Sequence, residues 1–89
     1  MALIACGLNH KTASLTLREQ AVFSPEDSLQ TLTNLLHQGA ANEAMILTTC
    51  NRTEFYTHVD HPHQFSDWLK QHPRIADIVQ SKHWYMHYD

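Results

Sequence analysis

The sequence predicts an α+β protein with the ferredoxin-like split βαβ arrangement (βαββαβ), a four-stranded antiparallel sheet that carries its helices on one face. Three observations lead to this prediction. The apolar segments follow the order strand, helix, strand, strand, helix, strand along the 89 residues. A helix with clear start and stop signals begins at Ser24. Two strand-like runs flank Cys50 with only a few polar residues between them, which predicts a hairpin.

The first strand is predicted over Ala2–Leu8, a short apolar run of the kind found in strands that are buried on both faces. Gly7 near its end permits either a close approach of another backbone or a turn. A polar loop follows at Asn9–Ser14, and Leu15–Ala21 is predicted to form a short helical turn. His10 lies in the polar loop, where a solvated histidine is the expected role.

The first main helix is predicted near Pro25–Gln38. Ser24 is a good N-cap, Pro25 suits the first helical position, and Gly39 is a natural stop after the last turn. Leucines recur at helical spacing along this segment and predict one core-facing stripe. The stripe consists of Leu29, Leu32, Leu35 and Leu36.

The second and third strands are predicted at Ala44–Thr48 and Thr53–Val59, so that Cys50 lies at the hairpin tip between them. The second of these runs alternates as a half-buried strand does. One face of it holds Phe55, Thr57 and Val59, and the other holds Tyr56 and His58.

A second main helix is predicted at His63–His72, where Pro62 can start the helix and Pro73 should end or kink it. Ile75–Val79 indicates one more helical turn, and the aromatic-rich run His83–Tyr88 is predicted to be the fourth strand. The predicted order in the sheet is fourth, first, third and second strand.

Length and charge limit the classes of protein. A chain of 89 residues is enough for one small domain. A net charge of −3, with six Lys and Arg residues, has the wrong sign for a domain that mainly grips a phosphate backbone. No apolar run approaches the ~18 residues of a membrane span, and the first residues lack the basic region of a secretory signal. We therefore expect a cytoplasmic protein, without membrane contact, whose two cysteines are reduced.

Cys50 is the candidate nucleophile. The alternative is a small buried hydrophobe, because free cysteine is among the most buried residue types. Its neighbours Thr49, Asn51 and Arg52 are polar and belong near water, which favours an exposed thiol. Arg52, if it folds back, would favour the thiolate, and the amide and hydroxyl groups could donate hydrogen bonds to an acyl oxygen. Cys6, inside the first apolar run, is expected to be buried and less reactive.

The eight histidines do not predict a metal site, because three or four ligands would have to converge in space. If His83 and His87 belong to one strand, they share a face but lie ~13 Å apart along it, too far to share an ion. Cys6 and Cys50 show no paired ligand spacing. We expect no metal ion.

Three segments stand out together, namely Gly7–Ala13, Leu17–Glu19 and Thr48–Glu54. They resemble the opening segment, a short motif and the active-site segment of the glutamyl-tRNA reductase family. The resemblance covers nearly the whole chain, with matching order and distance from the start. One departure is Ser14, where the family usually has proline, and this difference concerns loop rigidity rather than chemistry.

The resemblance implies an NADPH-dependent oxidoreductase of tetrapyrrole (porphyrin and haem) biosynthesis. The Cys50 thiolate would attack the ester that joins glutamate to the tRNA 3′ end, which gives an enzyme thioester and frees the tRNA. Hydride from NADPH would then reduce the thioester to glutamate-1-semialdehyde. By the same resemblance, Thr49, Asn51 and Arg52 line the glutamate site. The planar fork of Arg52 suits the substrate's side-chain carboxylate, so activation of the thiol and recognition of the substrate both remain open as its role.

The resemblance also implies that residues 1–89 are a truncated N-terminal part of a catalytic domain. The sequence has only two glycines, Gly7 and Gly39, and therefore no Gly-rich dinucleotide fingerprint. The rest of the catalytic domain, with a histidine near the nucleophile, an NADPH domain and a dimerisation domain are expected beyond Asp89. This chain alone is expected to bind no NADPH and to be inactive. The full enzyme is expected to be a homodimer that acts on glutamyl-tRNA and can contact the next pathway enzyme, an aminomutase.

A second class of function is a non-enzymatic ferredoxin-like module that binds RNA or a small ligand. Aromatic side chains could stack on bases: Tyr56, Trp84, Tyr85 and Tyr88. An RNA-binding sheet also needs basic residues beside its aromatics, and the charge balance of this chain opposes that.

Overall fold

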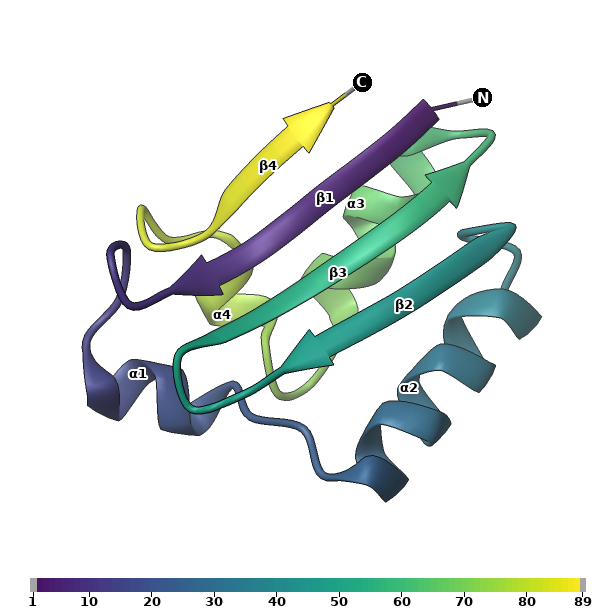
Figure 1. Cartoon of the computed structure of the whole chain (residues 1–89). Helices are drawn as coiled ribbons and strands as arrows, with labels where there is room; N and C mark the ends of the chain where they lie inside the picture. The colour runs from purple at the N-terminus through teal and green to yellow at the C-terminus, as the bar shows by residue number, and fades with distance from the viewer. Residues whose placement is uncertain (1, 89) are drawn as a thin grey trace.

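The structure is a computed structural model that describes residues 2–88. Its elements, in chain order, are β1 (Ala2–Asn9), α1 (Leu15–Gln20), α2 (Pro25–His37), β2 (Glu43–Thr48), β3 (Arg52–Val59), α3 (Pro62–Gln71), α4 (Ala76–Val79) and β4 (Tyr85–Tyr88). The four strands form one sheet in the order β2-β3-β1-β4, and every neighbouring pair is antiparallel. This confirms the predicted fold class and strand order (Figure 1).

The core lies between the sheet and the helices. In Figure 1, α3 and α4 lie behind the sheet, and α2 runs alongside β2. Leu35 of α2 and Phe65 of α3 are fully buried in the same apolar cluster as Phe55 of β3. Each strand alternates between this core and the opposite face, as the pleat requires. Ile4 and Cys6 of β1, for example, face the core.

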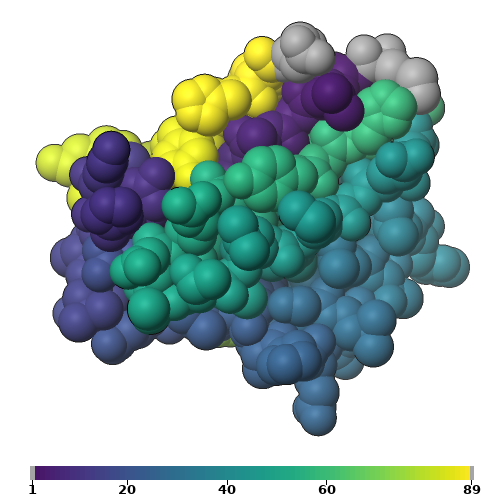
Figure 2. Space-filling view, in the orientation of Figure 1, coloured from purple at the N-terminus to yellow at the C-terminus, as the bar shows by residue number. Residues whose placement is uncertain are grey.

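The opposite face of the sheet is open, and Figure 2 views the molecule from this side. Leu3 and Met45 are exposed on it, with 52% and 54% of their surface accessible. Tyr56, opposite Met45 in the register, is half-buried on the same face. We call this surface the open face.

The helix signals around Ser24 are confirmed. The Ser24 hydroxyl accepts the N–H of Asp27 at 3.1 Å, and Pro25 occupies the first helical position. Gly39 follows the helix with a φ of +72°, a conformation that glycine adopts without the steric cost of a Cβ atom.

The predicted leucine stripe of α2 is only partly right. Leu35 is buried and Leu32 is half-buried, but Leu29 and Leu36 have 68% and 44% of their surface exposed. The helix turns a different face to the core, which includes the buried Thr31, because residues 28, 31, 32 and 35 lie on one side at helical spacing. Leu29 and Leu36, seven residues apart, lie together on its flank.

The predicted fourth strand begins too early. β4 starts at Tyr85, whereas the prediction began at His83. The backbone N–H of His83 donates to the Ser81 hydroxyl and that of Trp84 to the Ser81 carbonyl, so both residues belong to a turn. His83 also contacts the carbonyl of Thr12 through Nδ1 at 2.7 Å, which docks this turn on the loop after β1.

Gly7 lies where two backbones approach closely. A Cβ atom at this position would lie 2.1 Å from the carbonyl oxygen of Thr53 and 2.7 Å from the Cα atom of Glu54. Of the two roles that the sequence allowed for Gly7, the structure therefore shows the close approach. Within residues 2–88, no helix is both long and apolar enough to cross a membrane.

Candidate active site at the hairpin tip

Cys50 is exposed at the tip of the β2–β3 hairpin, as predicted. The tip is closed by the backbone N–H of Thr49, which donates to the carbonyl of Arg52 at 2.8 Å. The Thr49 hydroxyl oxygen accepts the backbone N–H groups of Asn51 and Arg52 at 3.1 and 3.2 Å. Thr49 thus fixes the shape of the turn that carries the thiol.

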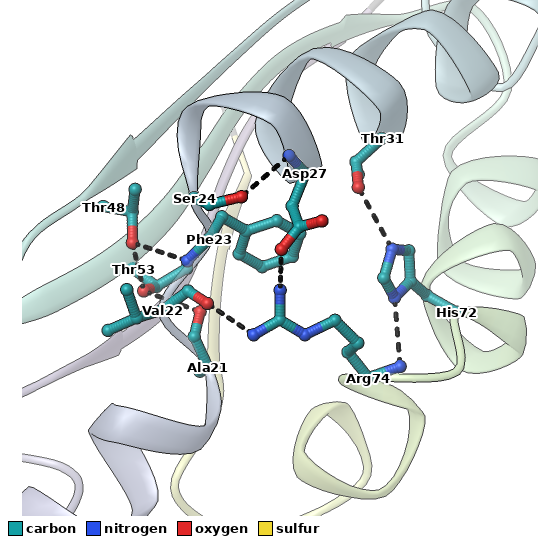
Figure 3. Close-up of polar contacts among 10 residues, drawn as sticks. All are labelled: Ala21, Val22, Phe23, Ser24, Asp27, Thr31, Thr48, Thr53, His72 and Arg74. Atoms are coloured by element: carbon teal, nitrogen blue, oxygen red, sulfur yellow. Dashed lines mark hydrogen bonds and ion pairs between the residues drawn. The ribbon is translucent and has the colours of Figure 1, made fainter.

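The base of the hairpin is tied to the loop between α1 and α2 by a chain of hydrogen bonds (Figure 3). The N–H of Phe23 donates to the Thr48 hydroxyl at 3.2 Å, and the Thr53 hydroxyl donates to the carbonyl of Ala21 at 3.0 Å. The two threonine hydroxyls are 3.1 Å apart. Because Thr53 uses its proton on Ala21, Thr48 donates to Thr53, and the whole chain is satisfied in one direction.

The same loop is held from its other side by Arg74, between α3 and α4 (Figure 3). Its guanidinium donates to the carbonyl of Val22, forms an ion pair with Asp27 at 3.0 Å, and lies over the Phe23 ring at 4.9 Å from the ring centre. The backbone N–H of Arg74 donates to Nδ1 of His72 at 3.2 Å. The base of the hairpin is therefore connected to the helical layer.

Arg18 of α1 reaches the tip itself. Its Nε donates to the carbonyl of Cys50 at 3.2 Å, and its Nη1 donates to the carbonyl of Ala13 at 3.0 Å. One guanidinium therefore joins the loop after β1 to the residue that carries the candidate nucleophile.

Arg52 does not need to fold back on Cys50 to find a partner. Its Nη1 lies 3.3 Å from the Glu54 carboxylate, two residues along β3 on the open face. The same carboxylate accepts the hydroxyl groups of Tyr56, at 2.8 Å, and of Tyr85. Glu54 thus holds a cluster of three donors beside the hairpin tip.

The partners of Glu54 in this cluster stabilise its ionised form. Burial alone would raise the pKa of Glu54, but the hydrogen bonds from Tyr85 and Tyr56 and the charge of Arg52 hold it below its usual value. Burial and the Glu54 carboxylate raise the pKa of Tyr85. Glu54 is therefore ionised near neutral pH and keeps Tyr85 protonated as a donor.

Gly7 makes the contact between Glu54 and Tyr85 possible. Both residues are its direct partners in the register, Glu54 on β3 and Tyr85 on β4. Directly paired residues share a face, so a side chain at position 7 would stand between them. Its absence lets the Glu54 carboxylate reach across β1.

The two cysteines lie in opposite environments, and both are free thiols. Cys6 is fully buried, and burial with the nearby Glu54 charge raises its pKa to about 12. Its thiolate is therefore strongly disfavoured, as the sequence predicted.

The four predicted site residues are contiguous at the hairpin tip: Thr49, Cys50 and Asn51 form the loop, and Arg52 is the first residue of β3. Sequence reasoning missed the roles of Glu54, Tyr85 and Arg18. Glu54 and Arg18 lie inside segments that carry the family resemblance, which was the available signal, but Tyr85 lies outside all three. His10 is exposed in the loop after β1 and joins no part of this site.

One other feature of the open face lies away from Cys50. A hollow of about 540 Å³ opens on the open face towards the far end of β2 and β3, lined among others by Leu3, Met45 and His58. No group of three or more His, Cys, Asp or Glu side chains that could hold a metal ion occurs in the described part of the chain.

Comparison with known proteins identifies the family. The model of the N-terminal domain of glutamyl-tRNA(Glu) reductase matches residues 6–89. A protein of Coxiella burnetii (strain Dugway 5J108-111) named glutamyl-tRNA reductase is 47% identical over 78 residues, which cover 88% of this chain and 19% of that protein. A Marinomonas protein (strain MWYL1) of the same name is 40% identical over 92 residues, which cover 100% of this chain and 22% of that protein. This chain therefore spans about a fifth of the length of these relatives.

Among solved structures, the glutamyl-tRNA reductase from Methanopyrus kandleri superimposes with a TM-score of 0.67 at 18% identity, over 98% of this chain and 19% of that one. At this identity the match supports the fold. The match of the family model over almost the whole chain shows that this chain belongs to the glutamyl-tRNA reductase N-terminal domain family.

Proposed function

We propose that this chain is the nucleophile-bearing N-terminal part of a glutamyl-tRNA reductase, an enzyme of tetrapyrrole biosynthesis. Its support is the family match over residues 6–89 together with relatives of that name at 40–47% identity. Because the chain spans about a fifth of those relatives, the rest of the catalytic domain, the NADPH domain and the dimerisation domain are assigned to parts outside residues 1–89.

The observation that carries this proposal is the exposed Cys50 on a loop that is anchored from both sides. The thiolate attacks the carbonyl carbon of the ester between glutamate and the tRNA. A carbon–sulfur bond forms, the carbon–oxygen bond breaks, and the tRNA 3′ oxygen leaves with the electron pair and takes up a proton. The product is a glutamyl thioester on Cys50.

Arg52 is proposed to bind the side-chain carboxylate of the substrate glutamate. Its guanidinium has five N–H donors, and Glu54 engages one of its terminal nitrogens, which leaves donors for a second carboxylate. Glu54 fixes the position of the guanidinium, and Arg52 is half-exposed and accessible. This favours the recognition role over activation of the thiol.

Thr49 and Asn51 are proposed to complete the glutamate site. The Thr49 oxygen accepts two backbone N–H groups, so its own proton remains available for an oxygen of the substrate. The exposed Asn51 amide offers donors and an acceptor beside the thiol.

The residues of this chain do not fit NADPH. A dinucleotide site of the usual kind needs a Gly-rich loop between a strand and a helix, and Gly7 and Gly39 are the only glycines of the sequence. Reduction of the thioester is therefore assigned to the longer enzyme, and the chemistry proposed for this chain ends at the thioester. Calorimetric titration of the chain with NADPH is expected to show no saturable binding.

The remaining predictions concern the longer enzyme. We expect the longer enzyme to form a homodimer, to contact the aminomutase that follows in the pathway, and to be located in the cytoplasm.

An RNA-binding module is the less favoured function. The open-face tyrosines that could stack on bases, Tyr56 and Tyr85, both donate their hydroxyl groups to Glu54. The Glu54 carboxylate is paired with Arg52, so the cluster offers no net positive charge to a phosphate backbone.

The test is a chimera in which residues 1–89 replace the matching segment of the Coxiella burnetii relative. The purified chimera is incubated with glutamyl-tRNA and NADPH, and glutamate-1-semialdehyde is measured. We expect activity, loss of activity in Cys50→Ser, and retention in Cys6→Ala. A folded chimera without activity, or an active Cys50→Ser variant, would contradict the proposal.

A further inference from the structure

Arg18 of α1 has no part in the chemistry proposed above, although it contacts the hairpin tip. It makes two charge-assisted bonds to backbone carbonyls, from Nε to Cys50 at 3.2 Å and from Nη1 to Ala13 at 3.0 Å. Ala13 is buried, so one end of the contact rests on a fixed part of the loop after β1. The other end is the carbonyl of the proposed nucleophile.

The other hydrogen bonds at the hairpin tip do not connect Cys50 to the rest of the fold. Those of Thr49 hold the turn in shape, but they join residues of the tip to one another. The bonds of Thr48 and Thr53 attach the base of the hairpin to the α1–α2 loop. Neither set connects the peptide of Cys50 with the remainder of the fold.

The guanidinium is suited to this connection. It is planar and charged at all working pH values, and its donors point in fixed directions, so two carbonyls in its plane are held at a set distance. Bonds from an ionised donor are roughly twice as strong as neutral ones. A lysine at this position keeps the charge but presents a single ammonium on a flexible chain.

We infer that Arg18 is a positioning residue for Cys50: it bridges the loop after β1 to the Cys50 carbonyl and thereby presents the thiol in one orientation to the ester of the substrate. This inference rests on the proposed function, because it takes Cys50 to be the nucleophile. Acyl transfer within a bound complex depends on the alignment of sulfur and carbonyl carbon. Alkylation by a small reagent in solution depends only on an accessible thiolate.

The experiment compares both reactions in the same variants. In the chimera described above, single-turnover transfer of labelled glutamate from tRNA to the enzyme is measured without NADPH at saturating glutamyl-tRNA. Arg18→Gln is expected to slow this transfer at least ~10-fold with unchanged affinity for glutamyl-tRNA. Arg18→Lys should give an intermediate rate. Lys11→Gln removes an exposed charge from the neighbouring loop and should leave the rate unchanged.

Two measurements on the 89-residue chain accompany the acyl-transfer experiment. The ¹⁵N relaxation of the Cys50 and Asn51 amides should show faster motion in Arg18→Gln than in the unsubstituted chain. The alkylation of Cys50 by iodoacetamide should change less than ~2-fold. These measurements apply even if the Arg18→Gln chimera fails to fold.

Unchanged acyl transfer in Arg18→Gln, or equal slowing of acyl transfer and alkylation, would overturn the inference. So would an amide of Cys50 that remains as rigid in Arg18→Gln as before. Absence of a glutamyl group on Cys50 in the unsubstituted chimera would instead overturn the proposed function, and the inference with it.

Discussion

The guanidinium of Arg52 lies 3.3 Å from the carboxylate of Glu54, on the open face of the sheet beside the hairpin tip. Tyr56 and Tyr85 donate to the same carboxylate, so its position is fixed by residues of two strands. The charge of Arg52 is therefore shared with a carboxylate, which limits what it can contribute to the thiol of Cys50.

The first prediction follows from this ion pair. In the 89-residue chain, Arg52→Ala should change the rate at which iodoacetamide alkylates Cys50 by less than ~2-fold, because a half-exposed and already paired charge acts weakly on a neighbouring group. In the chimera, the same substitution should weaken the binding of glutamyl-tRNA. Markedly slower alkylation in Arg52→Ala would show that the arginine activates the thiol.

The second prediction separates the two cysteines. Iodoacetamide should modify Cys50 well before Cys6, because Cys50 is exposed whereas Cys6 is fully buried and its pKa is raised to about 12. Mass-spectrometric mapping over time measures both rates, and added denaturant should narrow the difference. Faster labelling of Cys6 would mean that the hairpin tip is covered in solution.

The third prediction concerns the two glycines. Gly7→Ala should lower the free energy of unfolding by about 3 kcal/mol, because the new methyl group meets the backbone of Thr53 and Glu54. Gly39→Ala is the matched control, since its φ is +72° but no atom lies within 4 Å, and it should cost about 1 kcal/mol. Urea unfolding measures both. Equal costs at the two positions would contradict the close packing around Gly7.

The fourth prediction is a pH dependence of stability. Burial and the charge of Arg74 lower the pKa of His72 in the fold, and its Nδ1 accepts a backbone N–H only while the ring is neutral. The unfolded chain takes up this proton below pH ~6.5. The stabilising contribution of neutral His72 is therefore complete above that pH and is lost as the pH falls.

Urea unfolding at pH 7.5 and 5.5 tests this. His72→Gln, which does not titrate, should show a smaller loss of stability between the two values than the unsubstituted chain. An identical loss in both proteins would show that other groups cause the acid sensitivity.

The local signals in the sequence were enough to predict the fold. Ser24 and Pro25 marked the helix start, and the alternation from Phe55 to Val59 marked the half-buried strand, because both depend on neighbours in the chain. Two predictions were wrong because the features they concern depend on tertiary contacts. The exposure of Leu29 depends on how α2 is rotated against the sheet, and the turn at His83 depends on contacts with Ser81 and Thr12.

The candidate site was predictable only along one loop. The segment from Thr49 to Arg52 is contiguous, so its residue types could be read directly. Arg18 bonds to a residue 32 positions away, and Tyr85 bonds to Glu54 across 31 positions. Such contacts follow from the order of strands in the sheet rather than from any local pattern.

The central claim is that Cys50 takes the glutamyl group. The chimera is incubated with labelled glutamyl-tRNA without NADPH, digested, and mapped by mass spectrometry before and after treatment with hydroxylamine. We expect one glutamyl group on the peptide of Cys50, released by hydroxylamine as a thioester should be, and none on Cys6. A glutamyl group on any other residue, or a chimera that makes semialdehyde while Cys50 remains unmodified throughout, would contradict the account.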